Sequence, residues 1–369
     1  AFVATMVEES ESPLTDCAVL YRTNAQSRPL EDACMRRSIP YVIIGGISFY
    51  QRREVKDMLA LLRVALSDRD FVSFARTINL PKRGIGAVTL GKMQRLCDEL
   101  SIPLSEIPHH MSLSAKQRNG LESYLNVIAS IRAMIERHER LDHIVKSAID
   151  ESGYLDYLKE DLDTYRDRKE NLDELIATAA EWHAAREDTT LAAFLEELSL
   201  KSSTERIATE GALTLMTLHN AKGLEFDTVF LVGMEEDLLP HINSKLSPDA
   251  LEEERRLCYV GMTRAKRRLF LSRSTYRVVW GSPRSLRPSR FLSEIPSDYL
   301  VTLGENEEEE YGEGVFHEGA RVFHKDFGIG IVEASYDSSL GLTYDVFFPD
   351  EGITRSLVAQ YARLAPPPV

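Results

Sequence analysis

Two groups of short β-forming runs lie on either side of a long helical stretch, and this order limits the folds open to the chain. Residues 15–21 (TDCAVLY) and 41–44 (YVII) flank a helical pattern at 28–38, which predicts a strand–helix–strand unit. Residues 70–205 have an almost entirely helical pattern. Strand patterns return only in three later segments, at 213–218, 228–233 and 268–272. The sequence therefore predicts one α/β domain with a parallel sheet that is interrupted by an all-helical insertion.

The end of the chain differs from the rest in its composition and its hydrophobic pattern. Residues 304–318 contain seven Glu and no Lys or Arg, which is typical of a solvated linker. Residues 319–365 show short alternating strands punctuated by Gly and Asp, which predicts a small β-barrel. We therefore divide the chain into the α/β domain (1–110 and 210–298), the helical insertion (111–209), the linker (299–316) and the barrel (317–369).

The composition is typical of a soluble globular protein, since 43% of the 369 residues are hydrophobic and 28% are charged. No apolar run approaches the ~20 residues that cross a bilayer, and no signal peptide precedes the first residues. The four cysteines show no metal-ligand spacing and fit reduced thiols, so we expect a cytoplasmic protein without a metal site or a membrane partner. The chain starts at Ala1 without an initiator Met, which indicates a piece of a longer protein.

The net charge of −14 argues against general nucleic-acid binding, but the distribution of the charge allows a local site. Residues 255–290, here named the basic stripe, contain eleven Lys or Arg and no carboxylate. Nucleic acid needs a local basic surface and not a basic chain. We therefore expect DNA binding that is weak and steeply salt-dependent.

Polar residues follow two of the predicted strands. Arg22 lies where the first strand meets the segment YRTNAQSR, a usual position for a phosphate contact in an open α/β sheet, although a plain surface Arg fits equally well. The segment 217–241 (TLHNAKGLEFDTVFLVGMEEDLLPH) is more specific. His219 could contact a nucleic-acid backbone, and Gly223 allows a tight turn or the close approach of a ligand. Glu225, which we expect in a short helical segment, could accept hydrogen bonds from a ribose, although capping of a loop explains any single residue here.

Residues 251–271 (LEEERRLCYVGMTRAKRRLFL) predict a helix that runs into a strand. The glutamates at 252–254 lie in the first turns, and Arg264 and Lys266 lie near the end of the helix. The helix macrodipole favours each of these charges, so the pattern alone requires no function. Arg264 is also well placed to reach a phosphate. It is therefore a candidate arginine finger, which neutralises charge that develops on a transferring γ-phosphate.

The sequence carries no working phosphate-binding loop. Residues 86–93 (GAVTLGKM) match G-x-x-x-x-G-K, but Met93 stands where Ser or Thr must bind Mg²⁺, and the match follows helical sequence instead of a strand. The preceding turn, KRGIG, could hold a nucleic-acid phosphate through its amides and cations, or it could be a tight turn between helices. Its candidate residues are Lys82, Arg83, Gly84 and Gly86.

Taken in order, these segments resemble the C-terminal half of the UvrD/PcrA/Rep helicases. AVLYRTNAQSR is similar to helicase motif IV, LMTLHNAKGLEF to motif V, VFLVGMEEDLLPH to its extension, and EEERRLCYVGMTRAK to motif VI. The segments LPKRGIG, SGYLDYL, RKENLDEL and PSRFL also match the connecting segments of the family. The resemblance covers residues 16–295.

The resemblance implies a second RecA-like domain interrupted by a mobile helical domain, and ATP-driven 3′-to-5′ unwinding of DNA in repair or replication. In this family the nucleotide lies between two RecA-like domains, so ATP and Mg²⁺ would bind mainly to an N-terminal helicase domain that this chain lacks. The segment from about residue 317 resembles the Tudor-like barrel that ends many of these helicases, which implies RNA polymerase as a partner. The SGYLDYL segment would face duplex DNA.

The resemblance also implies roles for single residues. Tyr21 would stack near the adenine, and Arg22 and Arg264 would contact the γ-phosphate. Glu225 would bind the ribose, beside the turn at Gly223. The residues that would face single-stranded DNA are Thr217, His219 and His241.

A second class of function stays open, a non-catalytic module that joins DNA to RNA polymerase through the basic stripe and the barrel. A P-loop encoded upstream of Ala1 would favour the motor, whereas a start codon just before Ala1 would favour the module. A third class, a degenerate helicase-like nuclease subunit, is disfavoured because the sequence shows no carboxylate cluster with metal-ligand character.

Overall fold

The computed structural model of the chain divides into two compact units, Ala1–Ile295 and Pro296–Val369, which we describe separately. The structure describes residues 5, 12–186, 189–203, 211–245, 247–274, 276–279, 282–302, 316, 319–324, 327–338, 341–349, 353–358 and 364. The acidic segment that we predicted as a linker lies almost entirely outside these residues. Within these ranges no helix is both long enough and apolar enough to span a membrane.

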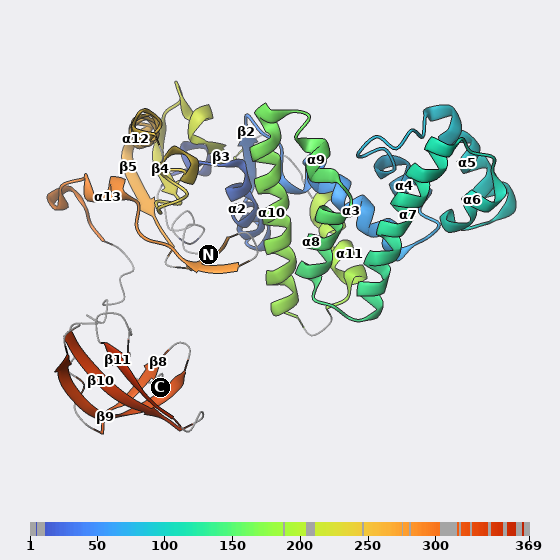
Figure 1. The fold of residues 1–369 in the computed structure, drawn as a ribbon. Helices are drawn as coiled ribbons and strands as arrows, with labels where there is room; N and C mark the ends of the chain where they lie inside the picture. Colours follow the sequence, from blue (N-terminus) through green and yellow to red (C-terminus); the bar gives the residue numbers. More distant parts are fainter. Residues whose placement is uncertain are drawn as a thin grey trace. The chain divides into compact units, whose positions relative to one another are not determined.

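The first unit is built on a five-stranded sheet in the order β2-β3-β1-β4-β5, and all neighbouring strands are parallel (Figure 1). At its centre, Val19 lies opposite Leu215 on one side and Phe230 on the other. The sheet therefore joins segments from both sides of the helical stretch, which confirms the split α/β domain. The strands are β1 (Cys17–Tyr21), β2 (Tyr41–Ile44), β3 (Leu213–Thr217), β4 (Phe226–Val232) and β5 (Ala265–Ser272).

Helices cover both faces of this sheet. On one face α2 (Ser27–Arg36) packs Ala33 and Cys34 against alternate residues of the central strands. On the other face α12 (Pro248–Met262) packs Cys258 against Met216 and Leu231. All residues of β1 and β3 are buried, as expected for parallel strands that are covered on both faces. A two-stranded hairpin (β6, Tyr276–Val279; β7, Ser282–Ser285) and a short helix, α13 (Arg290–Ser293), follow β5.

The stretch that we predicted to be helical forms a core of its own beside the sheet. The helix over Arg53–Leu66, just before this stretch, packs into the same core, where its Val55 and Leu62 are fully buried. The long helix α10 lies between the sheet and the other helices, where it contacts α8, α3 and α9 (Figure 1). These helices are α3 (Arg53–Leu66), α4 (Phe71–Thr77), α5 (Ala87–Leu100), α6 (Ile107–His110), α7 (Ala115–Glu136), α8 (Leu141–Glu151), α9 (Tyr154–Leu158), α10 (Leu162–Ala184) and α11 (Leu191–Ser203).

The second unit contains a four-stranded antiparallel sheet in the order β11-β10-β9-β8. Its core includes Val332, Tyr344, Val346 and Phe348. The strands fall where the alternating pattern predicted them, but closure of this sheet into a barrel stays a prediction. The strands are β8 (Arg321–His324), β9 (Gly328–Ser338), β10 (Gly341–Phe348) and β11 (Ile353–Val358).

Candidate functional site

The carboxyl end of β1 presents one buried and one partly exposed candidate residue. The ring of Tyr21 is 1% exposed and packs in the core, where burial, together with the nearby Glu31, raises the pKa of its hydroxyl. Arg22 follows on the opposite face of the strand, and its side chain is 19% exposed. The backbone N–H groups of Arg22 and Thr23 both donate to the side-chain oxygen of Gln26, at 3.0 and 2.9 Å. Gln26 lies in the short helix η2 (Asn24–Gln26) and fixes the backbone from which Arg22 projects.

The guanidinium of Arg22 is held by Glu254 of α12. Its Nε lies 3.0 Å from both carboxylate oxygens of Glu254, and its Nη2 lies 2.7 Å from Oε1. Glu254 also accepts from the backbone N–H of His241 at 3.0 Å and from the hydroxyl of Ser244 at 3.2 Å. Burial alone would raise the pKa of Glu254, but the hydrogen bonds and charge of Arg22, helped by His241 and Ser244, lower it below its usual value. The carboxylate is therefore ionised at neutral pH.

The turn between β3 and β4 holds four more of the predicted residues. Thr217 ends β3 and is 8% exposed, whereas His219 is exposed in the short helix η5 (Leu218–Ala221). Partial burial and the charge of Arg22 lower the pKa of His219, so its ring is neutral at neutral pH. Gly223 has φ +86°, a left-handed conformation that favours glycine. Glu225 is exposed immediately before β4, so our expectation of a helical segment there was wrong, because the chain has only a short turn in which to reach the start of β4.

Arg264 lies in the turn between α12 and β5. The helix ends at Met262 and Lys266 belongs to β5, so both charges lie past the helix end near which we expected them. The guanidinium of Arg264 donates to the carbonyl oxygens of Val260 at 2.9 Å and Leu224 at 3.1 Å. Its own carbonyl accepts from the N–H of Phe226 at 2.9 Å. Arg264 therefore ties the end of α12 to the turn that carries Gly223 and Glu225.

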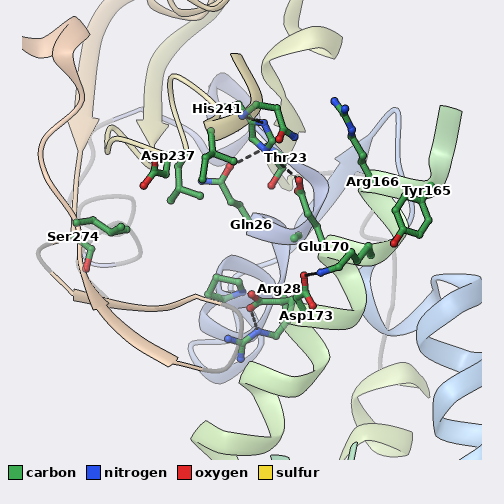
Figure 2. A pocket seen from close by; sticks show the side chains of 18 of the residues that line it. Thr23, Gln26, Arg28, Tyr165, Arg166, Glu170, Asp173, Asp237, His241 and Ser274 are labelled. Carbon is green, nitrogen blue, oxygen red and sulfur yellow. Dashed lines mark hydrogen bonds and ion pairs between the residues drawn. The ribbon is translucent and has the colours of Figure 1, made fainter. Parts of the chain in front are cut away.

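His241 lines a cavity of about 590 Å³ between η2, α10 and the loop after β4 (Figure 2). Its Nε2 lies 3.1 Å from a carboxylate oxygen of Glu170 on α10, and its Nδ1 accepts from the backbone N–H of Asn243. Figure 2 shows Tyr165, Arg166 and Glu170 of α10 on one wall of this cavity. We did not single out Glu170, Gln26 or Glu254 from the sequence, although Glu170 lies in RKENLDEL and Glu254 in the glutamate run, two segments of the resemblance.

The KRGIG turn lies between α4 and α5. Lys82 and Gly86 are exposed, and Gly84 has the left-handed φ of +79°. The guanidinium of Arg83 points into the fold, where it donates to the carbonyl oxygens of Ile78 (3.2 Å), Pro81 (3.3 Å) and Ser152 (2.7 Å). A second cavity of about 380 Å³ lies beside this turn, α7 and the SGYLDYL segment. Gly86 is the N-cap of α5, and the rest of the G-x-x-x-x-G-K match lies within this helix, which follows α4 and not a strand; this confirms that the match is no P-loop.

Part of the basic stripe is paired with carboxylates. Arg255 bonds Glu252 and Glu294, and Arg290 bonds Glu236 at 2.9 Å. Burial alone would raise the pKa of Glu236, but hydrogen bonds from Arg290 and Lys245 outweigh it and lower the pKa to about 2. These pairs reduce the charge that the stripe offers to a phosphate backbone.

Comparison with known proteins decides the family. The family model of the UvrD-like helicase C-terminal domain matches residues 2–276, which is most of the chain. The chain belongs to the UvrD-like helicase C-terminal domain family. Its relatives include the ATP-dependent DNA helicase PcrA of Staphylococcus epidermidis, 36% identical over 383 residues that cover 96% of the chain and 52% of that protein. The ATP-dependent DNA helicase PcrA of Staphylococcus aureus is 35% identical over 377 residues, with 94% and 52% covered.

The chain thus spans about half the length of the curated relatives that it matches. Within this UvrD-like domain, two groups of candidate residues lie around α12. Arg22 and His241 both bond Glu254, and Arg264 bonds the turn that carries Gly223 and Glu225. The turn at Lys82 belongs to neither group and lies in the helical part of the domain.

Proposed function

We propose that this UvrD-like domain is the C-terminal part of an ATP-dependent 3′-to-5′ DNA helicase that acts in DNA repair or replication. The observation that carries the proposal is the pair of arginines beside α12: Arg22, held by Glu254 of this helix, and Arg264, in the turn after it. The sequence lacks a complete P-loop, and the relatives named as ATP-dependent DNA helicases are about twice as long. The arginines therefore suit a nucleotide that is bound mainly by a second, RecA-like domain.

In this proposal Arg22 and Arg264 contact the γ-phosphate, and Arg264 acts as the arginine finger. Arg264 reaches that position by exchanging its bonds to the Val260 and Leu224 carbonyl oxygens for bonds to the phosphate. Glu225 is exposed in the adjoining turn and can accept a ribose hydroxyl, while Gly223 supplies the left-handed turn. Mg²⁺ would be held mainly by the other domain and would neutralise phosphate charge. Tyr21 can stack on adenine only after its ring leaves the core, because it is 1% exposed.

The proposed DNA contacts lie in two places. Thr217 and His219, at and just after the end of β3, and His241, in the loop after β4, would face single-stranded DNA. Lys82, with the amides at Gly84 and Gly86, would hold a phosphate of duplex DNA, while Arg83 shapes that turn through its bonds to carbonyl oxygens. The bonds to three carbonyl oxygens leave little of the Arg83 guanidinium for DNA, so we assign Arg83 the structural role.

We further propose that the second unit is the Tudor-like barrel of this helicase and binds RNA polymerase. The support is its small four-stranded antiparallel sheet. Deletion of residues 317–369 should abolish the capture of purified RNA polymerase by the full-length protein. Capture that persists after the deletion would remove this partner from the proposal.

Strand displacement by the full-length protein tests the proposed activity. With ATP, it should unwind a duplex with a 3′ single-stranded tail, and it should leave a duplex with a 5′ tail intact. The 369-residue chain alone should neither unwind DNA nor hydrolyse ATP. Unwinding from the 5′ tail would refute the direction, and no unwinding at all would favour the non-catalytic binding module.

A further inference from the structure

The carboxylate of Glu254 joins two groups of residues that have separate proposed ligands. On one side it binds the guanidinium of Arg22, for which we propose a phosphate ligand. On the other side it accepts the N–H of His241 and the hydroxyl of Ser244, which begin and end the loop at 241–244. The Glu254 side chain is only 5% exposed. A buried carboxylate with several donors has one satisfied geometry, so a shift of one donor disturbs the others.

The geometry of Arg22 leaves room for a second anion. Glu254 occupies Nε and Nη2, and among the described residues Nη1 has no acceptor. A guanidinium carries five N–H donors in a rigid fork, so a carboxylate can hold one edge while another edge binds a phosphate. The backbone of Arg22 is fixed separately by Gln26. Glu254 therefore sets the direction of the Arg22 side chain and leaves part of it available.

The 241–244 loop is anchored to the same carboxylate through its first residue. The ring of His241 lines the cavity and bonds Glu170 (Figure 2). The backbone N–H of His241 bonds Glu254. The described part of the chain shows no hydrogen bond between Arg22 and this loop. Any influence of Arg22 on the ring of His241 through hydrogen bonds must therefore pass through Glu254.

We propose that Glu254 is a positioning residue that couples a phosphate bound at Arg22 to single-stranded DNA bound at the 241–244 loop. The inference rests on the proposed function for the identity of the two ligands. When a phosphate draws the guanidinium outward, the carboxylate follows it and changes its bonds to His241 and Ser244. Because coupling between two binding sites is reciprocal, DNA at the loop also changes the affinity for the nucleotide.

Hydrogen–deuterium exchange on the 369-residue chain tests the link without any ligand. Arg22→Ala and Glu254→Ala should each speed amide exchange at 241–245 by about tenfold, as expected for a lost charge-assisted hydrogen bond. The control, Glu253→Ala, removes a neighbouring carboxylate that is 69% exposed and, among the described residues, bonds only Arg256 of the same helix, so exchange should not change. Glu254→Gln keeps the side-chain volume and one acceptor oxygen, and it replaces the Ala variant if that variant does not fold. If Arg22→Ala leaves the loop at the wild-type rate, the link is refuted.

A binding assay on the full-length protein tests the coupling itself. A non-hydrolysable ATP analogue should change the Kd for single-stranded DNA by about fivefold or more in the wild type and in Glu253→Ala. In Glu254→Ala both ligands should still bind, but the factor should fall to about one. A factor that persists in Glu254→Ala overturns the proposal. A wild type that binds no analogue contradicts the proposed function instead, and the exchange experiment then decides whether Glu254 links Arg22 to the loop.

Discussion

Gly120 of α7 offers a sharp test of how the KRGIG turn is held. A Cβ built on Gly120 would overlap the carbonyl oxygen of Arg83 and would lie 2.9 Å from its Cβ, whereas ordinary contacts begin at 3.4 Å. The obstacle is backbone, and it is anchored: Asn79 accepts from the N–H groups of Arg83 and Ile85. Gly91 of α5 provides the matched control, because it is also inside a helix but an added Cβ meets nothing within 4 Å.

The expected magnitudes follow from these two environments. Replacing a glycine inside a helix by alanine stabilises the fold by about 0.5–1 kcal/mol, and both variants share this gain. Overpacking costs about 1–3 kcal/mol, and only Gly120→Ala incurs it. We therefore expect Gly91→Ala to raise the free energy of unfolding. The free energy of unfolding of Gly120→Ala should be about 1–3 kcal/mol lower than that of Gly91→Ala. Gly120→Ala should also weaken binding to duplex DNA, because it displaces the turn that carries Lys82.

Urea unfolding followed by tryptophan fluorescence measures the difference. Trp182 is 5% exposed and belongs to the same helical core as Leu121 and Met93. Leu121 is next to Gly120 in the chain, and Met93 is two residues beyond Gly91. Fluorescence anisotropy with a labelled duplex measures the DNA affinity. If Gly120→Ala were as stable as Gly91→Ala, the turn would not pack against α7 as described and the reasoning would fail.

Three further predictions concern charge. The pKa of Glu236 is about 2 in the fold and near 4.5 when unfolded, so its contribution to stability is complete above about pH 4.5 and is lost as the pH falls toward 2. Glu236→Gln should flatten that part of an acid titration followed by circular dichroism, and an unchanged curve would contradict the pairing with Arg290. Because the pKa of His219 is lowered, single-stranded DNA affinity should strengthen only as the pH falls below about 6.5, and His219→Gln should remove this rise in anisotropy titrations. Lys82→Ala should reduce the slope of log K for duplex DNA against log salt by about one, and an unaltered slope would exclude a phosphate contact.

The order of elements was predictable because each strand and helix leaves a local pattern. All five strands of the parallel sheet and the antiparallel strands of the second unit lie where their periodicity placed them. The turn at Glu225 was placed wrongly, since a short connection carries little periodicity, whereas Arg264 lies at the junction between a helix and a strand, near where the charge pattern placed it. The local sequence showed that Arg22 and Arg264 could reach phosphate, but it could not show which partners hold them.

Those partners depend on tertiary structure. Arg22 and Glu254 are 232 residues apart in the chain, and only the pairing of β1 with β4 and the packing of α12 bring them together. The burial of Tyr21 likewise follows from which face of the sheet α2 covers. Glu170 reaches His241 only because α10 returns to the sheet after the other helices.

The central claim is that this domain supplies the arginine half of an ATP site. The most direct measurement is the kcat for ATP hydrolysis by the full-length protein at saturating single-stranded DNA. Arg264→Ala should lower kcat by about 10³-fold or more, while Arg137→Ala, which removes an exposed surface arginine bonded to Glu139, should leave it unchanged. Hydrolysis by Arg264→Ala at the wild-type rate would contradict the account.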